Sequence, residues 1–96
     1  MVTLSNIRDR RQDILRLAQA HGASNVRVFG SVARGQANEN SDLDLLVEMG
    51  PSRSLIDRIG LIHDLEDLLG NSVDVVNERA LHETLRDDVI AEAVDL

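Results

Sequence analysis

The 96-residue chain contains no cysteine, which excludes disulfides, thiolate catalysis and cysteine-ligated zinc. Lysine, tryptophan and tyrosine are also absent, and there is one phenylalanine. The lysine patches and aromatic stacking surfaces that usually hold single-stranded nucleic acid are therefore missing. The net charge of −7 also opposes binding to phosphate polymers, so we expect no direct contact with nucleic acid.

Long apolar runs are missing too. None approaches the roughly 20 residues of a membrane-spanning helix, and the stretch MVTLSNIRDRRQDIL has no apolar signal core. With 43% apolar and 28% charged residues, the composition is typical of a globular domain. The length fits a single domain over residues 1–96, and we expect it to be cytoplasmic and not to bind membranes.

Charge is distributed unevenly along the chain. Residues 1–34 contain six arginines and two acids, whereas residues 35–96 contain four arginines and fifteen acids. This split suits an anion site near the front of the chain and an acidic remainder that binds a metal or faces a basic partner. The simpler alternative is a solvated surface on which the charge is uneven.

Hydrophobic periodicity predicts helices that alternate with short strands. The predicted elements are a helix over 6–21, a strand over 26–29, a short helix capped by Ser31, a strand over 42–48, a helix over 54–70, a strand over 73–76 and a helix over about 78–94. The helix over 54–70 is long enough to connect parallel strands. We therefore predict an α/β (α+β) fold, with a small mixed sheet of about three to four strands flanked by helices.

Two aspartates, Asp42 and Asp44, lie one residue apart at the start of the second predicted strand. Side chains two positions apart on a strand project from the same face about 6.5 to 7 Å apart, close enough for both to reach one divalent ion. Carboxylates this close repel each other unless a cation lies between them. Asp74 adds a third carboxylate between valines, where a buried charge needs a metal, an arginine or a catalytic task.

Gly30 and Ser31 follow the first predicted strand and begin the short helix. Glycine lets the backbone approach a ligand closely, and unpaired N–H groups at a helix amino end attract an anion. Arg34, one turn later, adds positive charge for nucleotide binding. Three carboxylates on adjacent strands form the hard oxygen site that Mg²⁺ prefers, and the anion site would hold the phosphates of the substrate.

Each of these features has a purely structural interpretation when it is taken alone. A Gly-Ser pair between a strand and a helix is usually a turn with a cap, and an Asp-x-Asp after a polar loop is usually turn chemistry. Asp74 alone fits an edge strand that faces solvent. Their order along the chain, with the strand phase placing the carboxylates on one face, favours a shared site.

The stretch GSVARGQANENSDLDLLV contains Gly30-Ser31, ten intervening residues and then Asp42-Leu43-Asp44. It resembles the signature of the DNA polymerase beta-like nucleotidyltransferase superfamily. With one further helix after the third carboxylate, the chain is similar to the minimal nucleotidyltransferase (MNT) branch, whose members are antitoxins paired with HEPN-domain toxins. The resemblance extends from about Val26 to the terminal AEAVDL.

This resemblance implies roles for the candidate residues. Gly30 and Ser31 would hold the nucleotide phosphates, and Asp42 and Asp44 would bind two Mg²⁺ ions. Asp74 would help to bind metal and activate the attacking hydroxyl. The substrate would be ATP, with AMP placed on a tyrosine of a partner HEPN toxin and pyrophosphate released. The chain has no tyrosine, so the acceptor cannot be its own.

Two other functions fit the same residues. A binding-only antitoxin would mask its toxin with an acidic surface and would need no ATP. Nucleotidyl transfer to a small-molecule hydroxyl is the third candidate, and it ranks last. Relatives with that activity usually carry an extra substrate domain, for which 96 residues leave no room.

Overall fold

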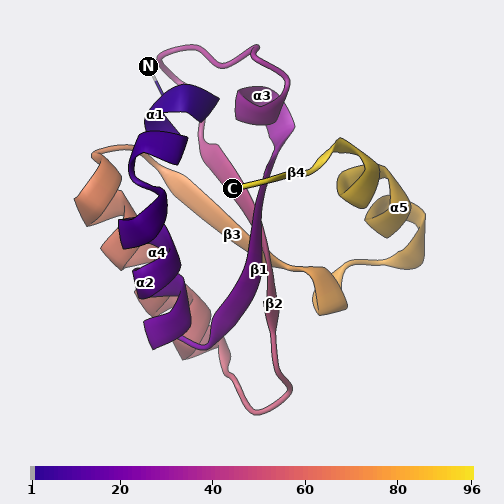
Figure 1. Cartoon of the computed structure of the whole chain (residues 1–96). Helices are drawn as coiled ribbons and strands as arrows, with labels where there is room; N and C mark the ends of the chain where they lie inside the picture. Colours follow the sequence, from indigo (N-terminus) through magenta and orange to yellow (C-terminus); the bar gives the residue numbers. More distant parts are fainter. Residues whose placement is uncertain (1) are drawn as a thin grey trace.

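The structure, a computed structural model, describes residues 2–96. A four-stranded sheet runs through its centre with helices on both sides (Figure 1). In chain order, the elements are α1 (Leu4–Asp9), α2 (Arg11–Ala20), β1 (Ala23–Phe29), α3 (Gly30–Ala33), β2 (Leu43–Met49), α4 (Leu55–Leu69), β3 (Val73–Asn77), the 3₁₀ helix η1 (Glu78–Ala80), α5 (Glu83–Glu92) and β4 (Val94–Asp95).

The sheet is mixed, and its strand order is β3-β2-β1-β4. β1 pairs antiparallel with β2 and β4, whereas β2 and β3 are parallel and are joined by the crossover helix α4. The predicted α/β fold with a small mixed sheet flanked by helices is therefore confirmed. Within residues 2–96, no helix is long and apolar enough to cross a membrane.

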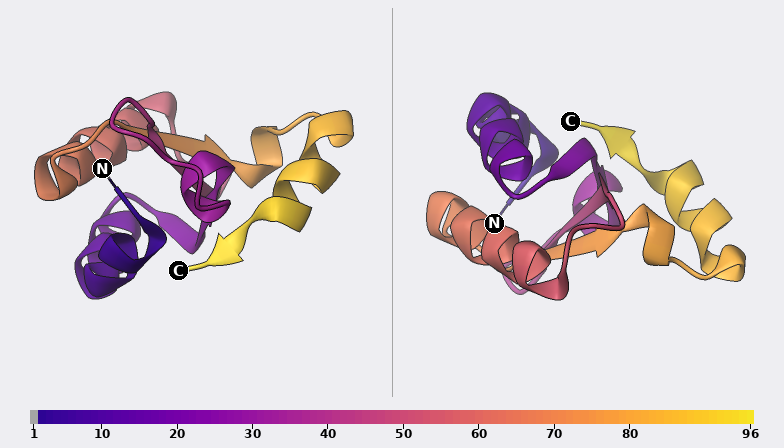
Figure 2. Two further views of the ribbon diagram at one scale, coloured as in Figure 1. Left: turned by 90° about the horizontal axis from the view of Figure 1, so that it is seen from above. Right: turned by 90° about the horizontal axis from the view of Figure 1, so that it is seen from below.

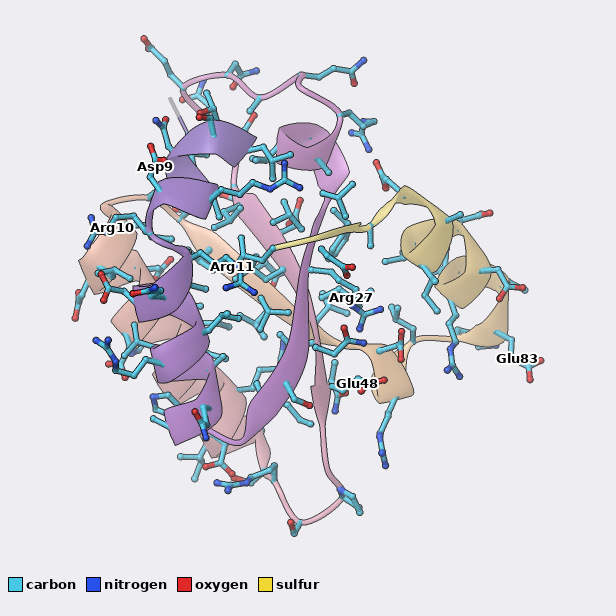
Figure 3. All side chains as sticks on the ribbon, viewed as in Figure 1. Asp9, Arg10, Arg11, Arg27, Glu48 and Glu83 are labelled. Carbon is cyan, nitrogen blue, oxygen red and sulfur yellow. The ribbon has the colours of Figure 1, made fainter. Side chains whose placement is uncertain are left out.

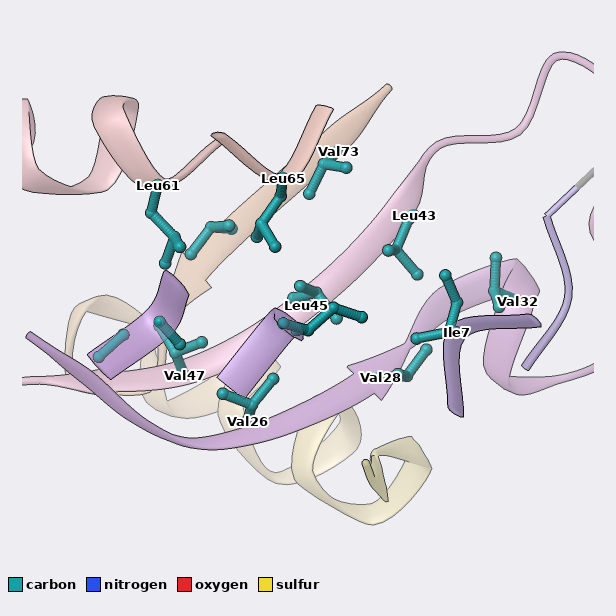
Figure 4. Close-up of a cluster of buried hydrophobic side chains, with 14 of the residues drawn as sticks. Ile7, Val26, Val28, Val32, Leu43, Leu45, Val47, Leu61, Leu65 and Val73 are labelled. Atoms are coloured by element: carbon teal, nitrogen blue, oxygen red, sulfur yellow. The ribbon is translucent and has the colours of Figure 1, made fainter. Parts of the chain in front are cut away.

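Helices α1, α2 and α4 cover one face of the sheet and enclose the core (Figures 2 and 4). Leu43, Leu45 and Val47 occupy every second position of β2 and point into this core, as their period of two predicts. Ile14 of α2 and Leu61 of α4 belong to the same buried cluster. Each fully buried aliphatic side chain stabilises the fold by about 1.5–3 kcal/mol, and together they fix the position of β2.

Helix α4 begins and ends within one residue of the predicted bounds. Ser54 and Asp57 form the expected capping box, and Gly70 ends the helix in the left-handed conformation with φ of 65°. The apolar face was predicted less well, because its first turns lie outside the core. Leu55, Ile56 and Ile59 are 59%, 80% and 41% exposed.

Helix α5 and η1 lie across the sheet from the other long helices (Figure 2). No residue of α5 is buried, and Leu85 and Ile90 are 58% and 38% exposed. The helix is tied to the sheet by β4, where Val94 pairs with Val28 of β1. The apolar residues of α5 are therefore not part of the core.

Two predicted helices are wrong in their extent. The helix over 6–21 is broken at Arg10, whose φ of −106° and ψ of 17° end α1 and precede α2, although neither glycine nor proline marks this position. The helix over 78–94 is divided into η1, α5 and β4. Leu81 and His82 are extended, and the His82 side chain caps α5 by accepting from the Thr84 N–H, so a new helix begins there.

Candidate active site

Asp44 and Asp74 lie side by side on the parallel strands β2 and β3, where they are register partners. Partners on parallel strands project from the same face, so the two carboxylates share one side of the sheet. β3 is an edge strand and Asp74 is exposed, so of the two interpretations of Asp74 the solvent-facing edge strand is confirmed and the buried charge is wrong. Asp42 directly precedes β2, which begins one residue later than predicted, and it is also exposed.

Asp44 is partly buried beside other negative charges. Its partial burial raises the pKa of its carboxyl above the ordinary 3.8, and the negative charges of Asp74 and Asp42 raise this pKa further. Within residues 2–96, no arginine or histidine forms an ion pair with Asp42, Asp44 or Asp74. Negative charge therefore accumulates here without a direct partner.

The turn formed by Gly30 and Ser31, called the anion turn below, lies against Asp44. Phe29, the last residue of β1, is the register partner of Asp44, and the chain turns into α3 at Gly30 with φ of 75°. A side chain at position 30 would overlap the Asp44 carboxylate. Only glycine allows both the left-handed conformation and this close approach.

Ser31 lies in the first turn of α3 and is not its N-cap as predicted, because Phe29 occupies that position. The first N–H groups of a helix have no partner within the helix. Gly30 and Ser31 therefore present backbone donors next to the carboxylates. The structure thus brings together Gly30, Ser31, Asp42, Asp44 and Asp74 at one end of the sheet.

Arg34 lies at the end of α3 and is held by two neighbours. Its Nη1 forms an ion pair with Glu92 of α5, and its Nε donates to Oε1 of Gln36 at 3.1 Å. Its positive charge lowers the pKa of Asp44, whereas the charge of Glu92 raises it. Glu92 is therefore a fourth carboxylate near the site, and the sequence pattern did not identify it.

The aspartates fit Mg²⁺ by the chemistry of their donors. They offer hard oxygen ligands. The negative charges of Asp74 and Asp42 contribute to the raised pKa of Asp44, and a bound cation would relieve this repulsion. As placed in residues 2–96, no three acidic or imidazole side chains converge closely enough to hold a metal ion. Binding would therefore require these side chains to turn toward a common point.

Replacing Gly30 by alanine should lower activity about tenfold, because the new Cβ displaces the Asp44 carboxylate and strains the backbone by about 1–2 kcal/mol. Gly35→Ala is the matched control. Gly35 also has a positive φ, of 71°, but nothing lies within 4 Å of a Cβ there. Activity assays and melting temperatures of both variants separate displacement of the Asp44 carboxylate from backbone strain. Equal activity in the two variants would show that the contact with Asp44 is unimportant.

The chain is similar in sequence to known proteins. A family model described as nucleotidyltransferase domain matches residues 7–96. A Methanocaldococcus jannaschii protein named "Putative protein adenylyltransferase MJ0435" is 40% identical over 91 residues, which are 95% of this chain and 98% of that protein. "Protein adenylyltransferase MntA" of Thermococcus cleftensis is 40% identical over 78 residues, 81% of this chain and 79% of that protein.

Two solved structures are similar throughout the fold. One, described as "putative minimal nucleotidyltransferase", has a TM-score of 0.88 and 52% identity, and the match covers 99% of this chain and 97% of that one. The other is a toxin-antitoxin with AMP-PNP, with a TM-score of 0.76 and 26% identity, covering 88% of this chain and 69% of that one. By its sequence, its fold and the residues gathered at one end of the sheet, this chain is an enzyme of the nucleotidyltransferase domain family.

Proposed function

We propose that this protein transfers AMP from ATP to a tyrosine hydroxyl of a HEPN-domain toxin, and that it thereby acts as the antitoxin. One observation carries the proposal. The Asp44 carboxylate lies beside Asp74 and against Gly30, so the carboxylates and the backbone anion donors form a single site. Relatives named protein adenylyltransferase and the toxin-antitoxin neighbour with AMP-PNP support the donor and the partner.

The reaction is an in-line displacement at the α-phosphorus of ATP. The acceptor oxygen forms a bond to this phosphorus, the bond to the β-phosphate oxygen breaks, and pyrophosphate leaves with the electron pair. The N–H groups at Gly30 and Ser31 orient the phosphates, and Arg34 offsets their charge. Asp74, which is exposed beside Asp44, is placed to accept the hydroxyl proton.

Asp42, Asp44 and Asp74 would hold Mg²⁺, in two ions according to the superfamily pattern. Bound there, the ions would neutralise charge that develops during the transfer. The remaining roles, which are positioning of the phosphates and acceptance of the hydroxyl proton, belong to the residues of the chain itself. With no tyrosine in this protein, the acceptor belongs to the partner.

Labelled ATP tests this function directly. Incubation of the protein with a HEPN toxin and Mg²⁺ should label the toxin from ATP carrying α-³²P and not from ATP carrying γ-³²P, because AMP is the group transferred. A tyrosine-to-phenylalanine change at the modified position of the toxin should remove the label. Label from the γ-position would instead indicate phosphoryl transfer, and toxin neutralisation without any label would indicate a binding-only antitoxin.

A further inference from the structure

Arg34 is fixed on two sides at the border of the active site. Nη1 forms an ion pair with Glu92, and Nε donates to Gln36 at 3.1 Å. No hydrogen bond to Nη2 is formed within residues 2–96. The Arg34 side chain is 49% exposed, so without these contacts its long stem would sample many rotamers.

Glu92 comes from a different layer of the fold. It lies in the last turn of α5, on the far side of the sheet from α2 and α4, and its side chain is 28% exposed. Immediately after it, β4 pairs with β1 and holds the end of α5 beside the strand that leads into Gly30. The ion pair therefore joins the anion turn to a helix that has no buried residue of its own.

We propose that Glu92 is a positioning residue: it holds the Arg34 guanidinium beside the carboxylates with one nitrogen free for the triphosphate. This inference rests on the proposed function, because it requires a nucleotide in this site. The backbone N–H of Arg34 donates to the Gly30 carbonyl at 3.1 Å, and Gly30 lies against the Asp44 carboxylate, which places the pair near the reacting groups. An arginine that is already oriented loses less side-chain entropy when it binds phosphate.

Nucleotide binding tests the proposal without relying on turnover. A nonhydrolysable ATP analogue with Mg²⁺ is titrated calorimetrically into the wild-type protein and into variants. We expect Glu92→Ala to weaken binding about fivefold, as the loss of a partly exposed charge-assisted contact predicts. In transfer assays, KM for ATP should rise by the same factor with kcat nearly unchanged, because the contact orients a binding group.

Three further variants separate positioning from other roles. Glu92→Gln keeps an oxygen that accepts from Arg34 and should bind nearly as the wild type, whereas Glu92→Asp keeps the charge but is too short and should resemble Glu92→Ala. In an Arg34→Ala background, Glu92→Ala should have no added effect. Arg86→Ala is the matched control, because it removes the contact of α5 with Glu78 at 3.9 Å and leaves Arg34 untouched.

Several results would overturn the proposal. Tighter binding by Glu92→Ala would mean that Glu92 competes with the phosphates for Arg34, and unchanged binding would mean that the ion pair has no role. If Glu92→Ala does not fold in a melting experiment, binding by Glu92→Asp and Glu92→Gln tests the proposal in its place. A wild-type protein that binds no nucleotide would overturn the proposed function and this inference with it, whereas normal wild-type binding confines a failure to Glu92.

Discussion

We expect Asp44→Asn, alone or together with Asp42→Asn, to lower the proposed transfer of AMP to a HEPN toxin by about a thousandfold, as the loss of a charged group at a reacting phosphate predicts. Asn keeps the size of the side chain and removes its charge. Asp44 lies beside Asp74 and against Gly30, so the change affects both the carboxylates proposed to bind Mg²⁺ and the anion turn. Scintillation counting of toxin labelled from ATP with α-³²P measures the loss. Equal labelling by the double variant would contradict the proposed reaction.

Asp44→Asn should not destabilise the protein, although it lowers activity. The pKa of Asp44 is raised in the folded protein by burial and by Asp74 and Asp42, so ionisation of Asp44 disfavours folding at neutral pH. The penalty is relieved as the pH falls through the folded pKa, and Asp44→Asn removes it at every pH. Without Mg²⁺, the variant should therefore melt no lower than the wild type at pH 7. Adding Mg²⁺ should raise the melting temperature of the wild type and not that of the variant.

Asp67→Asn serves as the control for both measurements. Asp67 is an exposed carboxylate of α4 and forms no ion pair within residues 2–96, so its loss changes the net charge by the same amount. Its activity and Mg²⁺ response should match the wild type. If Asp67→Asn lost activity as strongly as Asp44→Asn, the effect would reflect total charge and not the site.

Much of the candidate site follows from local rules. The alternation of Leu43, Leu45 and Val47 predicts which face of β2 packs into the main core, and it places Asp44 on the opposite face. The length of the helix over 54–70 predicts a parallel crossover, which brings Asp74 beside Asp44. The placement of Asp44 depends on the period of a strand and that of Asp74 on the length of the connecting helix, and both can be read from the sequence.

The parts that were missed depend on distant contacts. β4 is two residues long and forms only by pairing with β1, so no local pattern marks it. Glu92 approaches Arg34 because β4 holds the end of α5, and the two residues are 58 positions apart. Exposure of Asp74 depends on β3 being an edge strand, and strand order is likewise a property of the whole sheet.

A buried ion pair lies on the face of the sheet that η1 and α5 cover, and breaking it should destabilise the protein. Arg27 of β1 points toward η1, where its Nη1 lies 2.7 Å from Oε1 of Glu78, and both residues are 8% exposed (Figure 3). Arg27→Met should lower the free energy of unfolding by about 3 kcal/mol, because it leaves the buried Glu78 charge with only the longer contact to Arg86 at 3.9 Å. Urea denaturation at pH 7 measures this.

Arg16→Met provides the same substitution in an exposed pair. Arg16 lies 3.2 Å from Asp13, but its side chain is 75% exposed, and the expected cost is below about 1 kcal/mol. Similar losses for Arg16→Met and Arg27→Met would show that burial does not set the effect. Arg27→Met combined with Glu78→Leu should regain most of the loss, since two apolar side chains replace a buried pair at little cost.

The stability that Arg27 contributes should depend on pH, because Arg27 shifts the pKa of Glu78. The hydrogen bond from Arg27 holds the pKa of Glu78 below its ordinary 4.5, and this outweighs the effect of burial. A carboxyl whose pKa is lowered by folding stabilises the protein fully above the pKa of the unfolded chain, and this contribution is lost as the pH falls through the folded pKa. The difference between the wild type and Arg27→Met should therefore be constant from pH 6 to 8 and shrink below the ordinary pKa of Glu78. A difference that stayed the same in acid would mean that Arg27 stabilises the fold through its packing and not through the Glu78 charge.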